Sequence, residues 1–304
     1  RKVRHPESNL PVSAAKLLIE ELEGLYKVFP FLSDLADYGL PQTRKRTFLT
    51  FINRTLPGLD TLITKNLTPY PIPTHAPDHN GLPHVTLEAA LKQFGLPSLD
   101  ASSKEAAISD VEGGLHFVPI WQDRRYPMVA AIPPNSGKSA WENSVCIQCG
   151  EVNVNETDAI CPECGEPLLR PIVREKDGTV RLVNGFRSSS YKRMDPGLPA
   201  TTLTTGSGHI GSSTTIHPFE NRLLSPLECA YLQTFPISFD WGDALKQLGH
   251  THIRAMIGEA VPPYFTQLHG YILYDILLNR TPTSCLPLTD QRIKSAIEKL
   301  GTTN

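Results

Sequence analysis

Four cysteines are spaced as two metal-binding pairs. Cys146 and Cys149 form one Cys-x-x-Cys pair, and Cys161 and Cys164 form a second pair after eleven intervening residues. Each pair turns the chain so that two thiolates face one point, and two such pairs complete a tetrahedral Zn²⁺ site. The alternative is a pair of disulfides, which is disfavoured in an intracellular chain of this size. Because four thiolates leave no coordination position open, the sequence predicts a structural zinc ribbon over residues 144–168.

Two glycine-containing segments resemble nucleotide-binding motifs, and we reject both. Gly206 to Gly211 matches the dinucleotide fingerprint by letter, but serines and threonines follow where a helix should begin. Gly137-Lys138-Ser139 resembles the end of a phosphate-binding loop, but Ile132 occupies the position of the first glycine.

The remaining cysteines and histidines predict no further chemistry. Cys229 lies in a capped helical segment, where a small buried residue is favoured over a nucleophile. Cys285 lies in a proline-rich loop without a basic neighbour. No metal-ligand spacing relates the histidines at positions 209, 217, 250 and 252.

Short elements must position these residues. Ser225-Pro226-Leu227-Glu228 carries the signature of a helix start, with a capping serine and a reciprocal glutamate. Elsewhere apolar residues recur at helical spacing or in short β-branched runs, separated by turn-rich stretches. We expect helices over 12–28, 86–94, 226–234, 264–278 and 290–300, strands over 47–53, 113–120 and 128–132, a loop over 54–84 and turns over 133–215.

Length and composition set the broad class of the protein. The chain has 304 residues, which predicts two compact units, and its 27 prolines fit the turn-rich texture. A net charge of −2 excludes a uniformly basic nucleic-acid binder. The sequence has no run of 18 apolar residues and no secretory signal, so we expect a soluble, intracellular protein.

Positive charge is nevertheless concentrated in one stretch. Residues 170–193 hold seven basic side chains against Glu175 and Asp177, and serines and Tyr191 lie among them. Such a segment suits contacts with phosphates and base edges, although a run of charges can also be an ordinary solvated face. The basic residues are Arg170, Arg174, Lys176, Arg181, Arg187, Lys192 and Arg193.

Three segments occur together in one order. Gln42-Thr-Arg44-Lys-Arg46 has the pattern Gln-x-Arg-x-Arg, residues 217–236 contain an arginine and a central glutamate, and residues 258–263 read Gly-Glu-Ala-Val-Pro-Pro. Together they resemble late motifs of the DNA cytosine-5 methyltransferases, whose last motif is Gly-Asn-Ala-Val-Pro-Pro. The resemblance covers essentially the whole chain, but only the C-terminal half or so of the family's sequence plan.

The resemblance implies an α/β fold. Residues 1–53 would supply the last strands and a helix of a doubly wound, S-adenosylmethionine-dependent catalytic sheet. Residues 54–215 would form a loop-rich target recognition domain that contains the zinc ribbon, and residues 216–304 would return to close the catalytic domain.

The family's cofactor motif Phe-x-Gly-x-Gly, its nucleophile motif Pro-Cys-Gln and its Glu-Asn-Val motif do not occur here. The resemblance therefore implies a chain that is inactive alone, either a truncated piece or the recognition subunit of a split enzyme. Arg1 in place of Met favours truncation. The alternative is a non-catalytic zinc-ribbon DNA-binding protein derived from such an enzyme, but retention of Arg46 and of residues 258–263 speaks against it.

The resemblance also implies roles for the first motif. Family members flip the target cytosine out of double-stranded DNA, attack C6 with a cysteine thiolate and transfer a methyl group from S-adenosylmethionine to C5. Arg46 would bind the cytosine O2, because a guanidinium stays charged and offers directed donors. Arg44 would support the same wall or contact phosphate, and Gln42 would fix the strand. An exposed basic turn is the alternative for residues 44–46.

The family's two recognition loops would here be residues 186–194 and 206–213, joined by a short strand at 199–205. The expected DNA contacts are Arg187, Ser189, Tyr191, Lys192, Arg193, Gly206, Ser207 and His209.

The last motif would close the cofactor pocket, most of which lies in the missing half. Gly258 would allow close approach, with Glu259, Ala260 and Val261 beside it. Glu259 stands where asparagine is usual, and a carboxylate cannot donate to the carboxylate of the cofactor. The resemblance places the protein in a prokaryotic cytoplasm, associated with the nucleoid, and leaves open whether a restriction enzyme accompanies it.

Overall fold

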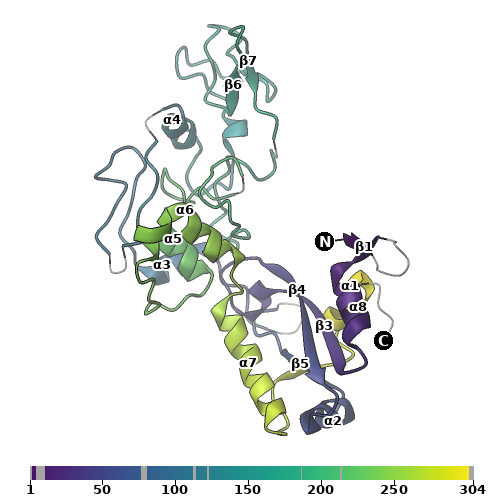
Figure 1. Ribbon diagram of the computed structural model, residues 1–304. Coiled ribbons are helices and arrows are strands. Elements are labelled where there is room, and N and C mark those ends of the chain that lie inside the picture. Colours follow the sequence, from purple (N-terminus) through teal and green to yellow (C-terminus); the bar gives the residue numbers. More distant parts are fainter. Residues whose placement is uncertain are drawn as a thin grey trace. The chain divides into compact units, whose positions relative to one another are not determined.

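The structure is a computed structural model that describes residues 2–4, 11–76, 81–111, 114–121, 123–185, 187–212 and 214–300 (Figure 1). The chain divides into two compact units. The first unit comprises Arg1–Gly39, Arg44–Pro83 and Pro263–Asn304, and the second comprises Leu40–Thr43 and His84–Pro262. No helix in the described part of the chain is both long and apolar enough to span a membrane.

The named strands of the described residues form four two-stranded antiparallel sheets. The pairs are β1 (Lys2–Arg4) with β2 (Pro11–Ser13), β3 (Tyr26–Asp34) with β4 (Lys45–Asn53), β5 (Leu67–Pro71) with β8 (Cys285–Pro287), and β6 (Ile172–Arg174) with β7 (Val180–Leu182). The α-helices are α1 (Ala14–Leu22), α2 (Pro57–Thr64), α3 (Leu87–Phe94), α4 (Arg125–Ala130), α5 (Pro226–Leu232), α6 (Ala244–Glu259), α7 (Pro263–Leu277) and α8 (Gln291–Leu300).

Aromatic side chains fill the core of the first unit. Phe31 of β3 stacks on Tyr70 of β5 with ring centroids 4.3 Å apart, and Phe265 of α7 lies 6.3 Å from Phe31. Helix α8 packs against β3, where Arg292 forms a 2.9 Å ion pair with Asp37. The long β3–β4 hairpin is therefore supported on both sides by elements from the C-terminal end of the chain.

The second unit is built around α3, α5 and α6, which Figure 1 shows grouped together. The Thr86 hydroxyl caps α3 by accepting from the Ala89 amide. Helix α6 is interrupted at Gly249, whose φ of 73° lies in the left-handed region that glycine adopts at little cost. Between these helices the chain is mainly turns, as its composition predicts.

Several sequence predictions are confirmed by the structure. Strand 47–53 lies within β4, and the helices expected over 86–94, 226–234, 264–278 and 290–300 are α3, α5, α7 and α8. Each is marked by a local signal, a capping residue, a proline at the first turn or strong periodicity.

The expected helix over 12–28 is only partly correct. The helix ends at Leu22, and Tyr26 already begins β3, which pairs with β4 along nine residues. The helical spacing near the end of this segment is overridden by cross-strand pairing with residues that lie far along the chain.

Four further expectations were wrong. The presumed loop at 54–84 contains α2 and β5, and Met128–Ile132 belongs largely to α4, because periodicity cannot assign an apolar run of five residues. Over 113–120 Phe117 makes only an isolated bridge, and Gly113 lies outside the described residues. The segment at 199–205 is not a strand, although Ala200 pairs with Gln42 in an isolated parallel bridge.

Candidate functional site

A buried ion pair stands at the start of α5. The Arg222 guanidinium donates from Nη1 to Oε2 of Glu228 at 2.7 Å and from Nη2 to Oε1 at 2.8 Å. The Ser225 amide donates to the same carboxylate at 2.7 Å, and the Ser225 hydroxyl accepts from the Glu228 amide at 3.1 Å. The capping box predicted from the sequence is thus formed, with a bidentate arginine added to it.

The protonation states around this pair are fixed by burial and by the neighbouring charge. Burial alone would raise the pKa of Glu228, but the charge and hydrogen bonds of Arg222 outweigh it and lower that pKa to about 2. Burial, with the charge of Arg222, lowers the pKa of His217 to about 4. Neutral His217 accepts at Nδ1 from the amides of Phe219 and Glu220, at 3.2 and 3.0 Å.

Gln42 connects the first motif to the second within one unit. Its Nε2 donates to the Leu232 carbonyl at 2.9 Å and to Oε1 of Gln233 at 2.8 Å, and its Oε1 accepts from the Leu203 amide at 3.3 Å. Gln233 in turn donates to the Ile257 carbonyl at 2.6 Å, next to the last motif. Gln42 and Gln233 are both fully buried, so this chain of hydrogen bonds is shielded from water.

Gly258, the first residue of the last motif, touches the segment that joins the two expected recognition loops. A Cβ at this position would lie 2.6 Å from the carbonyl oxygen of Thr204 and equally close to the Thr205 amide nitrogen. The glycine therefore admits another stretch of backbone, and no larger residue fits without movement.

Arg254 on α6 holds the start of the second expected loop. Its guanidinium donates to the carbonyls of Ser207 and Leu224, at 3.4 and 2.8 Å, and a Cβ on Gly208 would lie 3.2 Å from Arg254 Cδ. Ser207 and Arg254 are both buried, whereas His209 is exposed.

The two arginines of the first motif lie on and just before β4, in the first unit. The Arg44 amide donates to Oδ1 of Asp34 at 2.7 Å, and Arg46 pairs in register with Ser33. Burial, followed by the charge of Arg46, lowers the pKa of Arg44 to about 10. Arg46 is half-buried, and its Nη1 donates to the carbonyl of Lys45 at 2.9 Å. The charge of Arg46 thus acts on Arg44, and Arg46 is the more accessible of the two guanidinium groups to a ligand with oxygen acceptors.

The four cysteines converge on one point, as their spacing predicts. The sulfurs of Cys146 and Cys164 are 3.6 Å apart, those of Cys149 and Cys161 are 3.7 Å apart, and all four lie within 4.8 Å of one another. Tetrahedral Zn–S bonds of about 2.3 Å require S···S separations of about 3.8 Å, so the donor set fits Zn²⁺. A bound zinc ion would supply cross-linking only, because all four positions are thiolates.

Arg170 ties this cysteine module to the rest of the second unit. The buried guanidinium donates to the carbonyls of Asn143, at 2.7 Å, and Asp158, at 2.8 Å, and to the carbonyl of Asn155. Nη2 of Arg124 donates to the Leu168 carbonyl, and Leu168 packs beside Cys146 and Cys161. Two arginines thus hold the base of the module.

Arg193 has a different place from the one we expected. It is fully buried, and its guanidinium donates to the carbonyls of Ile132, Val129, His217 and Glu220 and to Oδ1 of Asn221, at 2.5 to 3.1 Å. With five oxygen partners inside the protein it cannot also reach DNA in this conformation. The expected DNA contact from Arg193 is therefore corrected to a structural role.

Tyr191 joins the two expected recognition loops. Its amide donates to the Ile210 carbonyl at 2.8 Å, its φ of 55° lies in the left-handed region, and its hydroxyl would lie 3.1 Å from a Cβ on Gly211. Trp141 packs edge-on against the Tyr191 ring, and Arg187 lies 5.3 Å from the Trp141 ring centroid.

The other expected DNA contacts are less constrained. Arg187 is exposed, Ser189 and Lys192 are half-buried, and Gly206 is half-buried at the start of its loop. The Ser189 carbonyl accepts from the Thr214 hydroxyl at 2.9 Å, a further link between the loops. The outer ends of the expected loops, Phe186 and Ser213, lie outside the described residues.

The expected cofactor residues after Gly258 are open to solvent. Glu259 and Val261 are exposed and Ala260 is half-buried. An ionised Glu259 can accept hydrogen bonds from an ammonium group or from ribose hydroxyls, but it cannot donate to a carboxylate. The chemistry of Glu259 thus fits the ammonium group or the ribose hydroxyls of S-adenosylmethionine and not its carboxylate.

Cys229 and Cys285 are buried, as a non-catalytic role requires. Burial raises the pKa of both thiols, that of Cys285 to about 12.

The sequence analysis did not single out Arg254 and Gln233, whose buried hydrogen bonds connect distant segments. It counted Arg170 and Arg193 in a basic stretch suited to DNA contacts, whereas both are buried. An arginine among turns carries no local sign that distant carbonyls will enclose it. Gln233 does carry a signal, because it lies inside the second motif.

Comparisons with known proteins place this arrangement in a family. The chain matches the family described as C-5 cytosine-specific DNA methylase over residues 4–270. It is 36% identical over 97 residues to Type II methyltransferase M.AquIB of Picosynechococcus sp., covering 30% of this chain and 67% of that protein. It is 37% identical over 98 residues to Type II methyltransferase M1.BsuMI of Bacillus subtilis, covering 31% of this chain and 22% of that protein. The chain belongs to the C-5 cytosine-specific DNA methylase family.

Proposed function

We propose that this chain is the C-terminal part of a DNA cytosine-5 methyltransferase, which reads the DNA and completes the pocket for the flipped cytosine. The observation that carries the proposal is the buried connection from Gln42 through Gln233 to Ile257. Gln42 and Gln233 are 191 positions apart in the sequence, and Gln233 and Ile257 are 24 positions apart. These are the places where the three family motifs lie, and their mutual contact supports a common role.

Within this proposal the family's methyl donor, S-adenosylmethionine, supplies the methyl group. Arg46 binds O2 of the extruded cytosine, and buried Arg44 adds a second positive charge beside it. Such fixed donors stabilise negative charge that develops on the base during attack, and they need no reorganisation because β4 holds them.

The nucleophile comes from a polypeptide segment outside this sequence. No Pro-Cys dipeptide occurs in the 304 residues, and Cys229 and Cys285 are buried with raised pKa values. The missing segment acts in cis or as a separate subunit.

The second unit, with the cysteine module and the loops at 186–194 and 206–213, reads double-stranded DNA. The doubly wound parallel sheet is completed by the missing segment, since the described residues alone contain small antiparallel sheets. The names of the two relatives place the protein in a restriction-modification setting.

The test is transfer of labelled methyl groups from S-adenosylmethionine to a mixture of duplexes. We expect no transfer by this chain alone and transfer when a segment carrying Pro-Cys-Gln is linked or added. Activity of the chain alone would contradict the proposal. Duplex binding without transfer in any combination would instead support a non-catalytic DNA-binding protein.

A further inference from the structure

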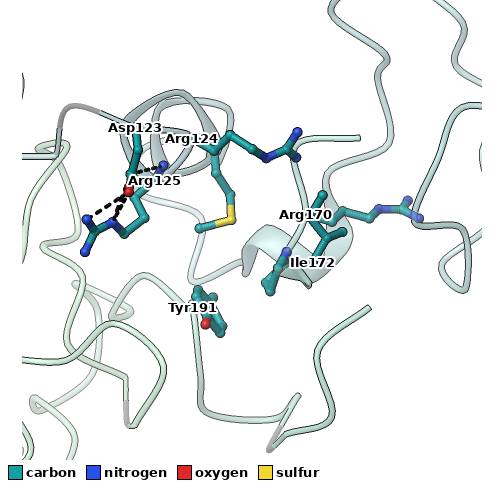
Figure 2. Close-up of a pocket in the computed structure, with 8 residues that line it drawn as sticks. Asp123, Arg124, Arg125, Arg170, Ile172 and Tyr191 are labelled. Atoms are coloured by element: carbon teal, nitrogen blue, oxygen red, sulfur yellow. Dashed lines mark hydrogen bonds and ion pairs between the residues drawn. The ribbon is translucent and has the colours of Figure 1, made fainter. Parts of the chain in front are cut away.

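A cavity of about 300 Å³ lies at the base of the cysteine module. Figure 2 shows its lining, with Arg124 and Arg125 at the start of α4, Arg170 and Ile172 on another wall, and Tyr191 below. The complete lining is Asp123, Arg124, Arg125, Met128, Arg170, Pro171, Ile172 and Tyr191.

The guanidinium groups here are hydrogen-bonded without being neutralised. Arg124 and Arg170 donate to main-chain carbonyls of the cysteine module. A carbonyl satisfies a donor but carries no formal charge, so both groups remain positive. Asp158 and Glu156 offset Arg170 in part, while Arg187 adds a repulsive charge to it, and Arg174 does the same to Arg124.

Arg174 and Arg187 are exposed, as Arg124 is, but they lack its hydrogen bonds to the cysteine module within the described residues. Within the described part of the chain neither pairs with a carboxylate. Their neighbours differ in this respect, because Arg181 lies 2.7 Å from Glu175 and Arg125 lies 2.8 Å from Asp123. Arg125 and Arg181 are therefore neutralised by carboxylates, whereas Arg174 and Arg187 keep a positive charge that can attract an anion.

We propose that the exposed Arg124, Arg174 and Arg187 bind backbone phosphates of DNA beside the sequence that the loops read, and that the buried charge of Arg170 adds to the attraction. These four residues are here called the arginine cluster. The inference rests on the proposed function. The cations come from the N-cap of α4, the base of the cysteine module, the end of β6 and the segment after β7, so they are spread over several elements. That spread suits successive phosphates of a duplex better than one free anion.

The cysteine module helps to position two arginines of this cluster. The carbonyls that hold Arg124 and Arg170 belong to residues 155–168, between and just after the two cysteine pairs. A zinc ion held by the four cysteines would fix these carbonyls and thereby the positions of Arg124 and Arg170.

The test measures duplex binding by the complete methyltransferase, with fluorescence anisotropy at 50 to 300 mM salt on two unrelated sequences. The double variant Arg174→Ala/Arg187→Ala removes two exposed cations of the cluster. Arg181→Ala is the matched control, because it removes an exposed arginine of the same hairpin whose charge is already paired. Arg174→Glu reverses one charge and breaks no side-chain hydrogen bond among the described residues.

We expect the double variant to bind about tenfold more weakly on both sequences. Each lost phosphate contact should reduce the slope of log K against log salt by about 0.9, so the double variant should lose about 1.8. Arg174→Glu should also weaken binding, and Arg181→Ala should match the wild type. An unchanged slope in the double variant, an equal effect of Arg181→Ala, or equally effective competition by inorganic phosphate would overturn the inference alone. Failure of the wild type to bind any duplex would overturn the proposed function with it.

Discussion

Nε2 of Gln42 donates to Oε1 of Gln233 at 2.8 Å in a fully buried contact. The two residues are 191 positions apart, and Gln233 passes the connection on to the Ile257 carbonyl. A buried amide that loses its partner pays a desolvation penalty, so this contact ties distant segments together and makes them depend on one another.

Gln42→Leu should destabilise the second unit. The change leaves Oε1 of Gln233 and the Leu232 carbonyl without the donor they now share, and we expect the free energy of unfolding to fall by about 2–4 kcal/mol. Urea denaturation followed by circular dichroism measures this. Gln247→Leu on the exposed surface of α6 is the control, with an expected change below about 0.5 kcal/mol. Equal effects of the two changes would contradict the role of Gln42.

Gly258→Ala should lower the free energy of unfolding, whereas Gly270→Ala should not. A Cβ at residue 258 would lie 2.6 Å from the Thr204 carbonyl oxygen, so we expect a loss of about 1–3 kcal/mol. A Cβ at residue 270 meets nothing within 4 Å on helix α7, and alanine there should stabilise by up to about 1 kcal/mol. Melting temperatures of the two variants measure this difference. An unchanged melting temperature for Gly258→Ala would show that the close approach of residue 258 to the Thr204 backbone is not needed.

The stability of the second unit should fall in mild acid through His217. Its folded pKa of about 4 lies below its ordinary value of 6.5, so the unfolded chain binds the proton first. The contribution is present above pH 6.5 and is lost as the pH falls toward 4, at about 1.4 kcal/mol per pH unit.

Asparagine at position 217 keeps an acceptor for the amides of Phe219 and Glu220 and removes the titration. Urea titrations of wild type and His217→Asn at pH 8, 6 and 5 measure the difference, in which the effects of His269 and the cysteines cancel. Parallel pH profiles for the two proteins would show that His217 does not titrate as its burial requires.

The chain should bind one zinc ion through its four clustered cysteines. Cys161→Ser should abolish zinc, measured by mass spectrometry of the metal content, and should increase hydrogen exchange over residues 144–170, since Arg170 then loses its fixed carbonyl partners. Cys285→Ser changes a buried cysteine outside the cluster and should keep the metal. Zinc retained after Cys161→Ser would exclude the proposed ligand set.

The features that sequence could predict are those with local causes. The capping box of Ser225 and Glu228 involves residues three apart, and each Cys-x-x-Cys turn is complete within a few residues. The three motifs lie far apart in the sequence, so only the resemblance to a family indicated that they belong together.

What could not be predicted depends on distant partners. The five oxygens that accept hydrogen bonds from Arg193 come from residues near positions 130 and 220. The sequence around residue 193 has no pattern that predicts these partners. In the same way β3 exists because β4 pairs with it, although the sequence before it continues at helical spacing.

The central claim is that this chain completes the cytosine pocket of a methyltransferase, and Arg46 tests it most directly. The measurement is kcat/KM for methyl transfer by the complete enzyme carrying Arg46→Ala or Lys45→Ala, the second removing the exposed cation next to it on β4. We predict that Arg46→Ala lowers kcat/KM by about 10²–10³, as loss of one fixed donor at a developing charge does, while Lys45→Ala changes it little. Wild-type turnover by Arg46→Ala would contradict the account.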